Sequence, residues 1–296
     1  SGVTSLSAVS GVAAFGDLRL TGKAGSYTLS FAIPGTDLSV SQVIEVTAGA
    51  ASKFKFIQLP QDVEAGQTFA QTVSAEILDA TDNRVLTAGT GTVVQAVWDI
   101  NGVGGSFGVT YGFVPSQGLI EFNGLTWSIA NTYSLRIEVA SGSVLTGIAA
   151  TSSPLFVVTP AGPSKIEWVG SEPTGGVSNG LLDVQPSFVI KDQFDNEVEV
   201  APLVTVSASV VSANSGDVVR VIGGAATNSG NQFVNFSGLG LEALVDDYVL
   251  SFSAEVAAGV FASVSTSQPV TITHGSLSAL VLVTPAGGAG SDLAFD

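Results

Sequence analysis

The side chains best suited to chemistry in this sequence are paired carboxylates, since the chain holds one histidine and no cysteine. Asp79 precedes Asp82 by three positions, and Asp192 precedes Asp195 in the same way. Carboxylate oxygens are the ligands that Ca²⁺ prefers, but neither pair has the dense run of oxygen ligands found in calcium-binding loops. We therefore expect both pairs to shape turns, with a Ca²⁺ site as the weaker interpretation and no other cofactor.

The sequence offers little for catalysis or zinc binding. His274, the single histidine, stands beside Gly275 at a predicted domain joint, and no nucleophile elbow accompanies it. A zinc site needs several Cys or His ligands, which this composition does not supply. A glycosidase needs two carboxylates across a cleft. The sequence leaves such a pair open, but small repeated domains are poor hosts for it. We predict a protein that is not an enzyme.

Two further patterns could carry covalent chemistry. Asn235, Phe236 and Ser237 form the N-x-S sequon of the chain, so Asn235 is a glycosylation candidate. Lys53 and Lys165 recur at equivalent places, where an internal isopeptide bond to an Asn is one hypothesis and a plain surface lysine the alternative. Three tryptophans are expected to pack in cores or joints, with an exposed sugar-binding platform as the alternative: Trp98, Trp127 and Trp168.

Composition limits the classes of protein to consider. Of the 296 residues, 45% are hydrophobic and only 11% are charged, against about 25% charged in an ordinary soluble domain. Such low charge is typical of exported proteins. The net charge of −16 argues against nucleic acid and against anionic membrane surfaces as partners. No run approaches the ~20 apolar residues of a spanning helix, so membrane insertion is not expected.

A repeat organises the chain. The pattern F-x-x-L-x-(L/W), a gap, then Y-x-L-x-(F/I) occurs three times, with its tyrosines 106 and 115 positions apart. Alternating apolar and polar residues in these stretches predict strands with one buried face. The aromatic residues expected to form the repeated core are Phe15, Tyr27, Phe122, Tyr133, Phe236 and Tyr248.

A second repeated signature is D-x-x-D-N-x-V, at residues 79–85 and 192–198. Its Asp82–Asn83 and Asp195–Asn196 pairs are suited to tight turns, because Asp and Asn tolerate positive φ. Short strands with frequent turns over about 110 residues are typical of an immunoglobulin-like (Ig-like) sandwich. We predict an all-β fold of tandem Ig-like β-sandwich domains joined head to tail.

These two signatures resemble the bacterial Ig-like repeats of the invasin and intimin type. The resemblance covers essentially the whole chain and rests on the D-x-x-D-N-x-V turn and the F-x-x-L…Y-x-L-x-F ending. The family usually has Gly just before the Asn of the turn, where this chain has Asp82 and Asp195. The resemblance implies sandwiches in series that serve as stalks, adhesins or fibres at a cell surface, and it carries over no catalytic residue.

Alignment of the repeats predicts four parts. Residues 1–47 are the C-terminal half of one domain, 48–159 and 160–273 are complete domains, and 274–296 are the first strands of another. Short joints favour a semi-rigid string. Half a domain would leave large apolar side chains in water, each worth ~1.5–3 kcal/mol when buried. We expect the ends to be completed by continuation of the chain or by strand addition from neighbouring subunits.

The resulting functional prediction is a non-catalytic repeat segment of an extracellular filament, surface layer or stalk. Its expected partners are copies of itself or further repeats of the same chain, with glycans as an open second partner. The alternatives are a cell-surface adhesin or carbohydrate-binding module, and an accessory region of an enzyme. A binding module would use the most distinctive loops, residues 101–107 or the insert 212–229.

Overall fold

The computed structural model describes residues 2–89, 91–101, 111–199, 203–213, 219–228, 230–257 and 259–275. The chain divides into two compact units, residues 1–161 and 162–296. Within the described ranges every regular element is a β-strand, as the all-β prediction requires. In the same ranges, no helix is long and apolar enough to cross a membrane.

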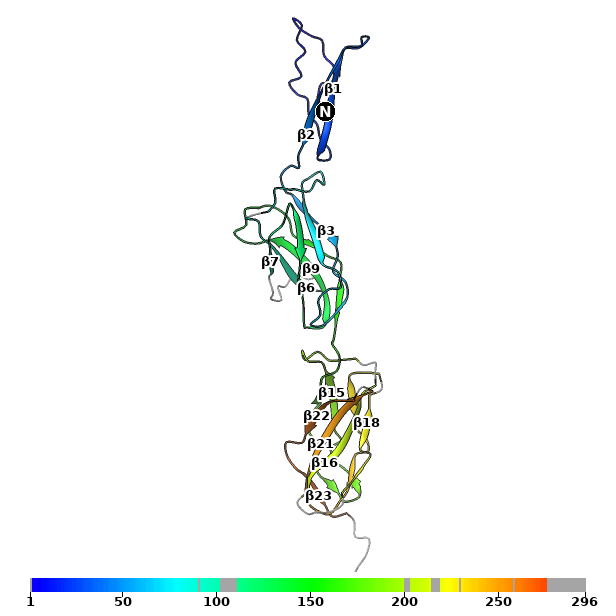
Figure 1. Ribbon diagram of the computed structural model, residues 1–296. Helices are drawn as coiled ribbons and strands as arrows, with labels where there is room; N and C mark the ends of the chain where they lie inside the picture. Colours follow the sequence, from blue (N-terminus) through cyan, green and yellow to red (C-terminus); the bar gives the residue numbers. More distant parts are fainter. Residues whose placement is uncertain are drawn as a thin grey trace, which may run out of the picture. The chain divides into compact units, whose positions relative to one another are not determined.

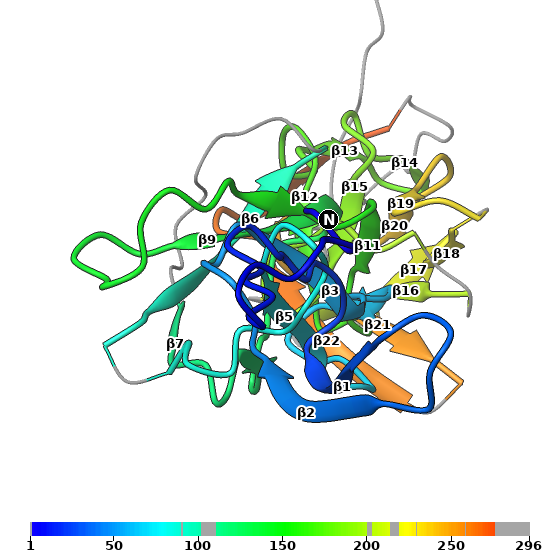
Figure 2. The same ribbon diagram turned by 90° about the horizontal axis from the view of Figure 1, so that it is seen from above.

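The first unit begins with a two-stranded antiparallel sheet. Strands β1 (Gly25–Ala32) and β2 (Ser39–Val46) pair from Gly25 with Val46 to Ala32 with Ser39, and they lie side by side in both ribbon views (Figures 1 and 2). Much of this hairpin is in contact with water. Val40 is 67% exposed and Val43 57%, so the hairpin carries apolar surface that its own unit does not cover.

Two further sheets of the first unit form a sandwich. One sheet has the order β3-β5-β8 and the other β4-β11-β9-β6-β7, with β10 also paired to β9. The strands are β3 (Lys53–Gln58), β4 (Val63–Glu64), β5 (Val73–Leu78), β6 (Val94–Ile100), β7 (Tyr111–Phe113), β8 (Leu119–Phe122), β9 (Asn131–Val139), β10 (Thr151–Ser152) and β11 (Phe156–Thr159). The short β4 runs parallel to β11, whereas the neighbouring strands are antiparallel.

The second unit repeats this order. Its sheets are β12-β15-β19, β13-β23-β21-β16-β18 with β22 also paired to β21, and an added β14-β20-β17. The strands are β12 (Lys165–Trp168), β13 (Gly176–Val177), β14 (Gly180–Leu181), β15 (Ser187–Lys191), β16 (Thr205–Ala213), β17 (Arg220–Ile222), β18 (Ala225–Thr227), β19 (Phe233–Asn235), β20 (Gly240–Glu242), β21 (Asp247–Val256), β22 (Gly259–Ser265) and β23 (Val270–Thr273). Again a short strand, β13, runs parallel to the last, β23.

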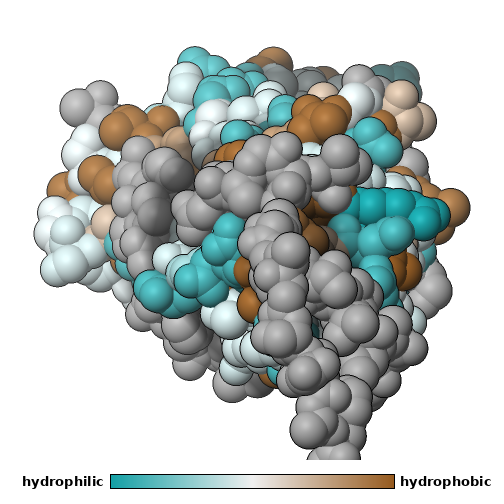
Figure 3. All heavy atoms as spheres, turned by 90° about the horizontal axis from the view of Figure 1, so that it is seen from below, coloured by the Kyte–Doolittle hydropathy of each residue, from teal (hydrophilic) through white to brown (hydrophobic). Residues whose placement is uncertain are grey.

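Period-two alternation explains both sandwiches. Along β21 the side chains of Tyr248, Leu250, Phe252 and Ala254 are fully buried, while the residues between them are more exposed. Strand β9 buries its alternate apolar residues Tyr133, Leu135 and Ile137, and also Ser134 between them, so each large sheet turns one face to the core. Both sandwiches are Ig-like in strand order, as predicted. Figure 3, a space-filling view of the outside seen from below, shows apolar and polar residues interspersed among the described residues.

Several predicted segments lie outside the described residues. They are residues 276–296, which include most of the predicted fourth part, residues 102–107 of the Gly-rich loop, and residues 214–218 and 229 of the insert. The division of the chain into four parts therefore stays a prediction. The boundary between the two compact units lies after Ala161, and the predicted boundary between the second and third parts lies after residue 159.

Candidate functional site

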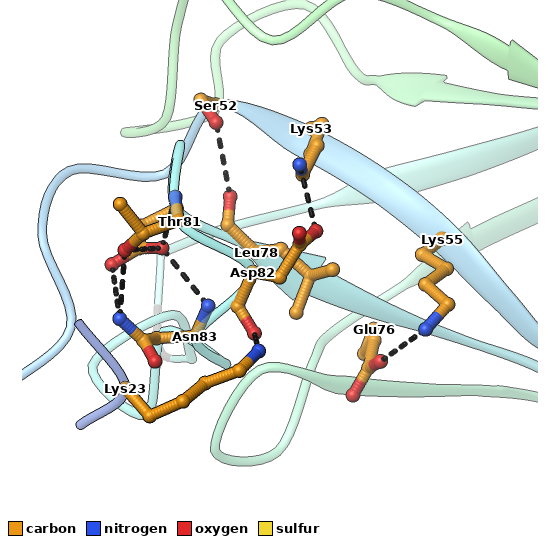
Figure 4. A network of polar contacts seen from close by, with 10 residues as sticks. Lys23, Ser52, Lys53, Lys55, Glu76, Leu78, Thr81, Asp82 and Asn83 are labelled. Atoms are coloured by element: carbon orange, nitrogen blue, oxygen red, sulfur yellow. Dashed lines mark hydrogen bonds and ion pairs between the residues drawn. The ribbon is translucent and has the colours of Figure 1, made fainter. Parts of the chain in front are cut away.

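The first D-x-x-D-N-x-V turn is built around the carboxylate of Asp79, which is only 4% exposed. Its Oδ1 accepts hydrogen bonds from the amides of Thr81 at 2.8 Å and Asn83 at 2.9 Å, and from Thr81 Oγ1 at 2.9 Å. Its Oδ2 accepts from the amide of Gly49 at 2.8 Å and from Asn83 Nδ2 at 3.0 Å. Five donors converge on one carboxylate, and Figure 4 shows the turn that they close.

These donors stabilise the charged form of Asp79. The amide of Asn83, followed by that of Gly49, holds the pKa of the Asp79 carboxyl well below its usual range, against the opposing effect of burial. This carboxylate therefore serves as a hydrogen-bond acceptor for main-chain N–H groups. Within the described residues, no three His, Cys, Asp or Glu side chains gather in a way that could hold a metal ion.

The second turn has the same geometry. Asp192 is fully buried, and its Oδ1 accepts from the amides of Phe194 at 2.8 Å and Asn196 at 2.9 Å. Asn196 Nδ2 donates to Asp192 Oδ2 at 2.8 Å. The φ angles of Asp82 and Asp195 are 64° and 71°, in the left-handed region that Gly adopts freely and that Asp and Asn tolerate. The turn role predicted for both Asp–Asn pairs agrees with this backbone.

The recurring lysines pair with these turns. Lys53 Nζ lies 2.7 Å from Asp82 Oδ1, and Lys165 forms the matching ion pair with Asp195. The hydrogen bond from each lysine is the main cause that lowers the pKa of its aspartate. The partner of each lysine is thus a turn aspartate and not the asparagine of the isopeptide hypothesis. Recurrence of both residues in the two repeats was the sequence signal for this pairing.

A feature that sequence reasoning missed is a tyrosine corner in each repeat. The hydroxyl of Tyr27 donates to the Lys23 carbonyl at 2.7 Å, that of Tyr133 to the Ile129 carbonyl at 3.0 Å, and that of Tyr248 to the Leu244 carbonyl at 2.9 Å. Each bond runs back four residues. Such corners are a hallmark of Ig-like sandwiches, and they explain why the repeat has Tyr where Phe would fill the same space.

The predicted aromatic core is buried in the two sandwiches but not in the first 47 residues. Phe122, Tyr133, Phe236 and Tyr248 are at most 5% exposed. By contrast, Tyr27 is 36% exposed, and Phe15 is half-buried with its ring centroid 5.1 Å from that of Phe31. The expectation that residues 1–47 are half of a domain stays a prediction.

The tryptophans pack within their units. Trp98 is fully buried and stacks on Trp127, with ring centroids 5.4 Å apart. Trp127 Nε1 donates to Tyr133 Oη at 2.8 Å, while burial raises the pKa of the Tyr133 phenol. Trp168 packs on Phe188 at 4.5 Å. Core packing, the first of the two interpretations, describes these contacts.

The remaining candidates lie on the surface. Asn235 is exposed at the end of β19 between buried Val234 and Phe236, as the alternation predicts, and it accepts a hydrogen bond from Ser187 Oγ. Glycosylation at Asn235 stays a prediction. His274 is exposed just after β23, where it is one solvated side chain.

No protein-family model and no curated protein matches this chain. Among solved structures, it is similar to the Escherichia coli adhesin FdeC, with 21% identity, a TM-score of 0.37, and coverage of 84% of this chain and 74% of that one. Surface layer protein SbsC gives 14% identity and a TM-score of 0.28, covering 85% and 32% of the two chains. A β-glycosidase from Bacteroides vulgatus gives 10% identity and a TM-score of 0.28, with coverage of 75% of this chain and 25% of that one. These values decide neither activity nor partners.

The lowered pKa of Asp79 predicts acid sensitivity of the first sandwich. Because the folded pKa lies below the unfolded value of about 3.9, the stabilisation is complete above that value and is lost progressively as the pH falls from there through the folded pKa. Asp79→Asn should lower the urea midpoint at pH 7. Between pH 7 and pH 3 the midpoint of this variant should then fall less than the midpoint of the parent. The exposed Asp37→Asn serves as control. Tryptophan fluorescence in a Trp168→Phe background reports the midpoint, and equal pH profiles for Asp79→Asn and the parent would contradict the assignment.

The tyrosine corners predict unequal costs of Tyr→Phe substitutions. Tyr248→Phe removes one hydrogen bond and should destabilise its unit by about 1 kcal/mol, whereas Tyr133→Phe also leaves Trp127 Nε1 without its acceptor and should cost about 2 kcal/mol. Hydrogen exchange of the β9 and β21 amides measures both losses. Tyr27→Phe should leave β9 exchange unchanged. A Tyr133→Phe variant as stable as the parent would show that its hydroxyl bonds contribute nothing.

Proposed function

We propose that this chain is a structural repeat segment of an extracellular filament, surface layer or stalk, without catalytic activity of its own. The observation that carries the proposal is what the recurring residues do. Asp79 and Asp192 bind the main chain of their turns, and Tyr133 and Tyr248 bind main-chain carbonyls. Residues that recur because they maintain each repeat are what an array of similar domains requires.

The surface chemistry supports a location outside the cell. With 11% charged residues, the chain relies on neutral polar side chains for its surface. The net charge of −16 favours solubility and disfavours binding to nucleic acid. Because the chain has no cysteine, no disulfide links the sheets of either sandwich, and about 110 residues can bury a sufficient apolar core without one.

The β1–β2 hairpin supports the proposal of partners that are similar chains. Leu38, Val40 and Val43 are each more than half exposed, and a two-stranded hairpin is marginally stable by itself. We propose that further repeats of the same chain, or a strand from a neighbouring subunit, cover this hairpin. Strand addition repeated from subunit to subunit would produce an open head-to-tail polymer, whereas further repeats of the same chain would extend the string of domains.

Electron microscopy of the source cells tests this function. Gold-labelled antibodies against residues 48–273 should decorate fibres, a lattice or stalks on intact cells, with no permeabilisation needed. Cells lacking the gene are the control. Labelling that appears only after permeabilisation would overturn the extracellular assignment.

A binding assay separates the adhesive alternative. Beads coated with the purified chain should fail to bind host cells or glycan arrays if the role is structural. Saturable binding that a soluble excess of the chain competes away would move the assignment to an adhesin or carbohydrate-binding module.

A further inference from the structure

The turn asparagine of the first sandwich makes contacts outside its own turn. Asn83 Oδ1 accepts a hydrogen bond from the amide of Ala24 at 2.7 Å, and Asn83 Nδ2 donates to the Gly22 carbonyl at 3.1 Å. Nearby, Lys23 Nζ donates to the Asp82 carbonyl at 3.1 Å, as Figure 4 shows. One primary amide thus pairs with the N–H and C=O groups that flank Lys23, in the loop before β1.

The turn itself orients this amide. Asn83 Nδ2 also donates to Asp79 Oδ2 at 3.0 Å and to Thr81 Oγ1 at 2.9 Å. Asn83 is 6% exposed, so its side chain has little freedom left. The amide therefore needs no reordering to receive a partner, and preorganisation of this kind lowers the cost of binding.

The loop is also held in place on its own side. Tyr27, the corner tyrosine of β1, donates its hydroxyl hydrogen to the Lys23 carbonyl. That carbonyl lies between the two main-chain groups that Asn83 contacts. The tyrosine corner of one repeat thus presents the main chain that the turn of the next repeat contacts.

The surroundings of this contact are partly open. A hollow beside it is lined by residues of both parts, among them Ala24, Val46, Ala48 and Leu86. Because these apolar groups surround open space, the hydrogen bonds of Asn83 specify how the two parts meet.

We propose that Asn83 is a docking residue whose partner is the main chain of the loop before a tyrosine corner in the preceding Ig-like repeat. The contact uses the main-chain N–H of Ala24 and C=O of Gly22, so loop sequence is free to vary. The loop before the corner of Tyr248 differs in sequence from the loop before Tyr27. The second turn orients Asn196 through Asp192, as the first turn orients Asn83 through Asp79. The partner is thus another repeat of this kind.

This inference rests on the proposed function, because a string of repeats needs joints that are specified by the repeats themselves. Its test is independent of cell-surface labelling. The full chain is labelled with ¹⁵N, and amide exchange and relaxation are measured in the parent, Asn83→Ala, Thr81→Val and Ala24→Pro. Thr81→Val is the matched control, since it weakens the turn without removing a bond to the loop.

Asn83→Ala should accelerate exchange of the Ala24 amide roughly three- to tenfold, the range expected for loss of one hydrogen bond. The Val85 amide, which bonds to the Ile77 carbonyl within the turn region, should keep its protection. Thr81→Val should leave Ala24 exchange within about twofold of the parent. Unchanged Ala24 exchange in Asn83→Ala, with Val85 still protected, would overturn the inference.

Ala24→Pro keeps the inference testable if Asn83→Ala opens the turn. It removes the donated hydrogen from the loop side and leaves the turn residues intact. The β1–β2 amides should then relax faster than those of β9, whereas in the parent and in Thr81→Val the two sets should relax together. Matching relaxation in Ala24→Pro would show that this contact does not join the hairpin to the sandwich, while surface labelling could still succeed.

Discussion

The demand of main-chain N–H groups for acceptors governs the recurring residues of this protein. A turn at the edge of a sandwich turns its amides away from the sheet, and each buried amide without a partner would cost free energy. Asp79 and Asp192 meet that demand with a charged carboxylate under each turn. Charge-assisted hydrogen bonds are stronger than neutral ones, so one short aspartate side chain suffices to close each turn.

Main-chain carbonyls have the complementary demand for donors. Strand β9 and strand β21 each begin beside a loop whose carbonyl accepts a tyrosine hydroxyl. The ring fills the core while its polar end reaches the main chain, which is the usual way for a tyrosine to be buried. Burial of apolar strand faces supplies the stability, and these polar contacts select one conformation for the loops that connect the strands.

Seen together, the polar side chains of the repeats serve the fold and its joints. The residues first considered for calcium, Asp79, Asp82, Asp192 and Asp195, are engaged with amides or lysines of their own unit. A protein built in this way presents repeated shape to its surroundings. That property is the basis of the structural role proposed above.

The sequence by itself determined the strands, the repeat and the turns, because these follow from local rules. Alternation marks a buried strand face, as in β9, and Asp–Asn pairs mark positive φ. Only the tertiary structure decided which groups meet across long separations. Asn83 contacts Ala24 across 59 positions, and Lys53 meets Asp82; neither pairing leaves a local periodicity to read. These groups come together because the sheets pack. A single sequence contains both residues of such a contact but does not indicate that they are neighbours in the fold.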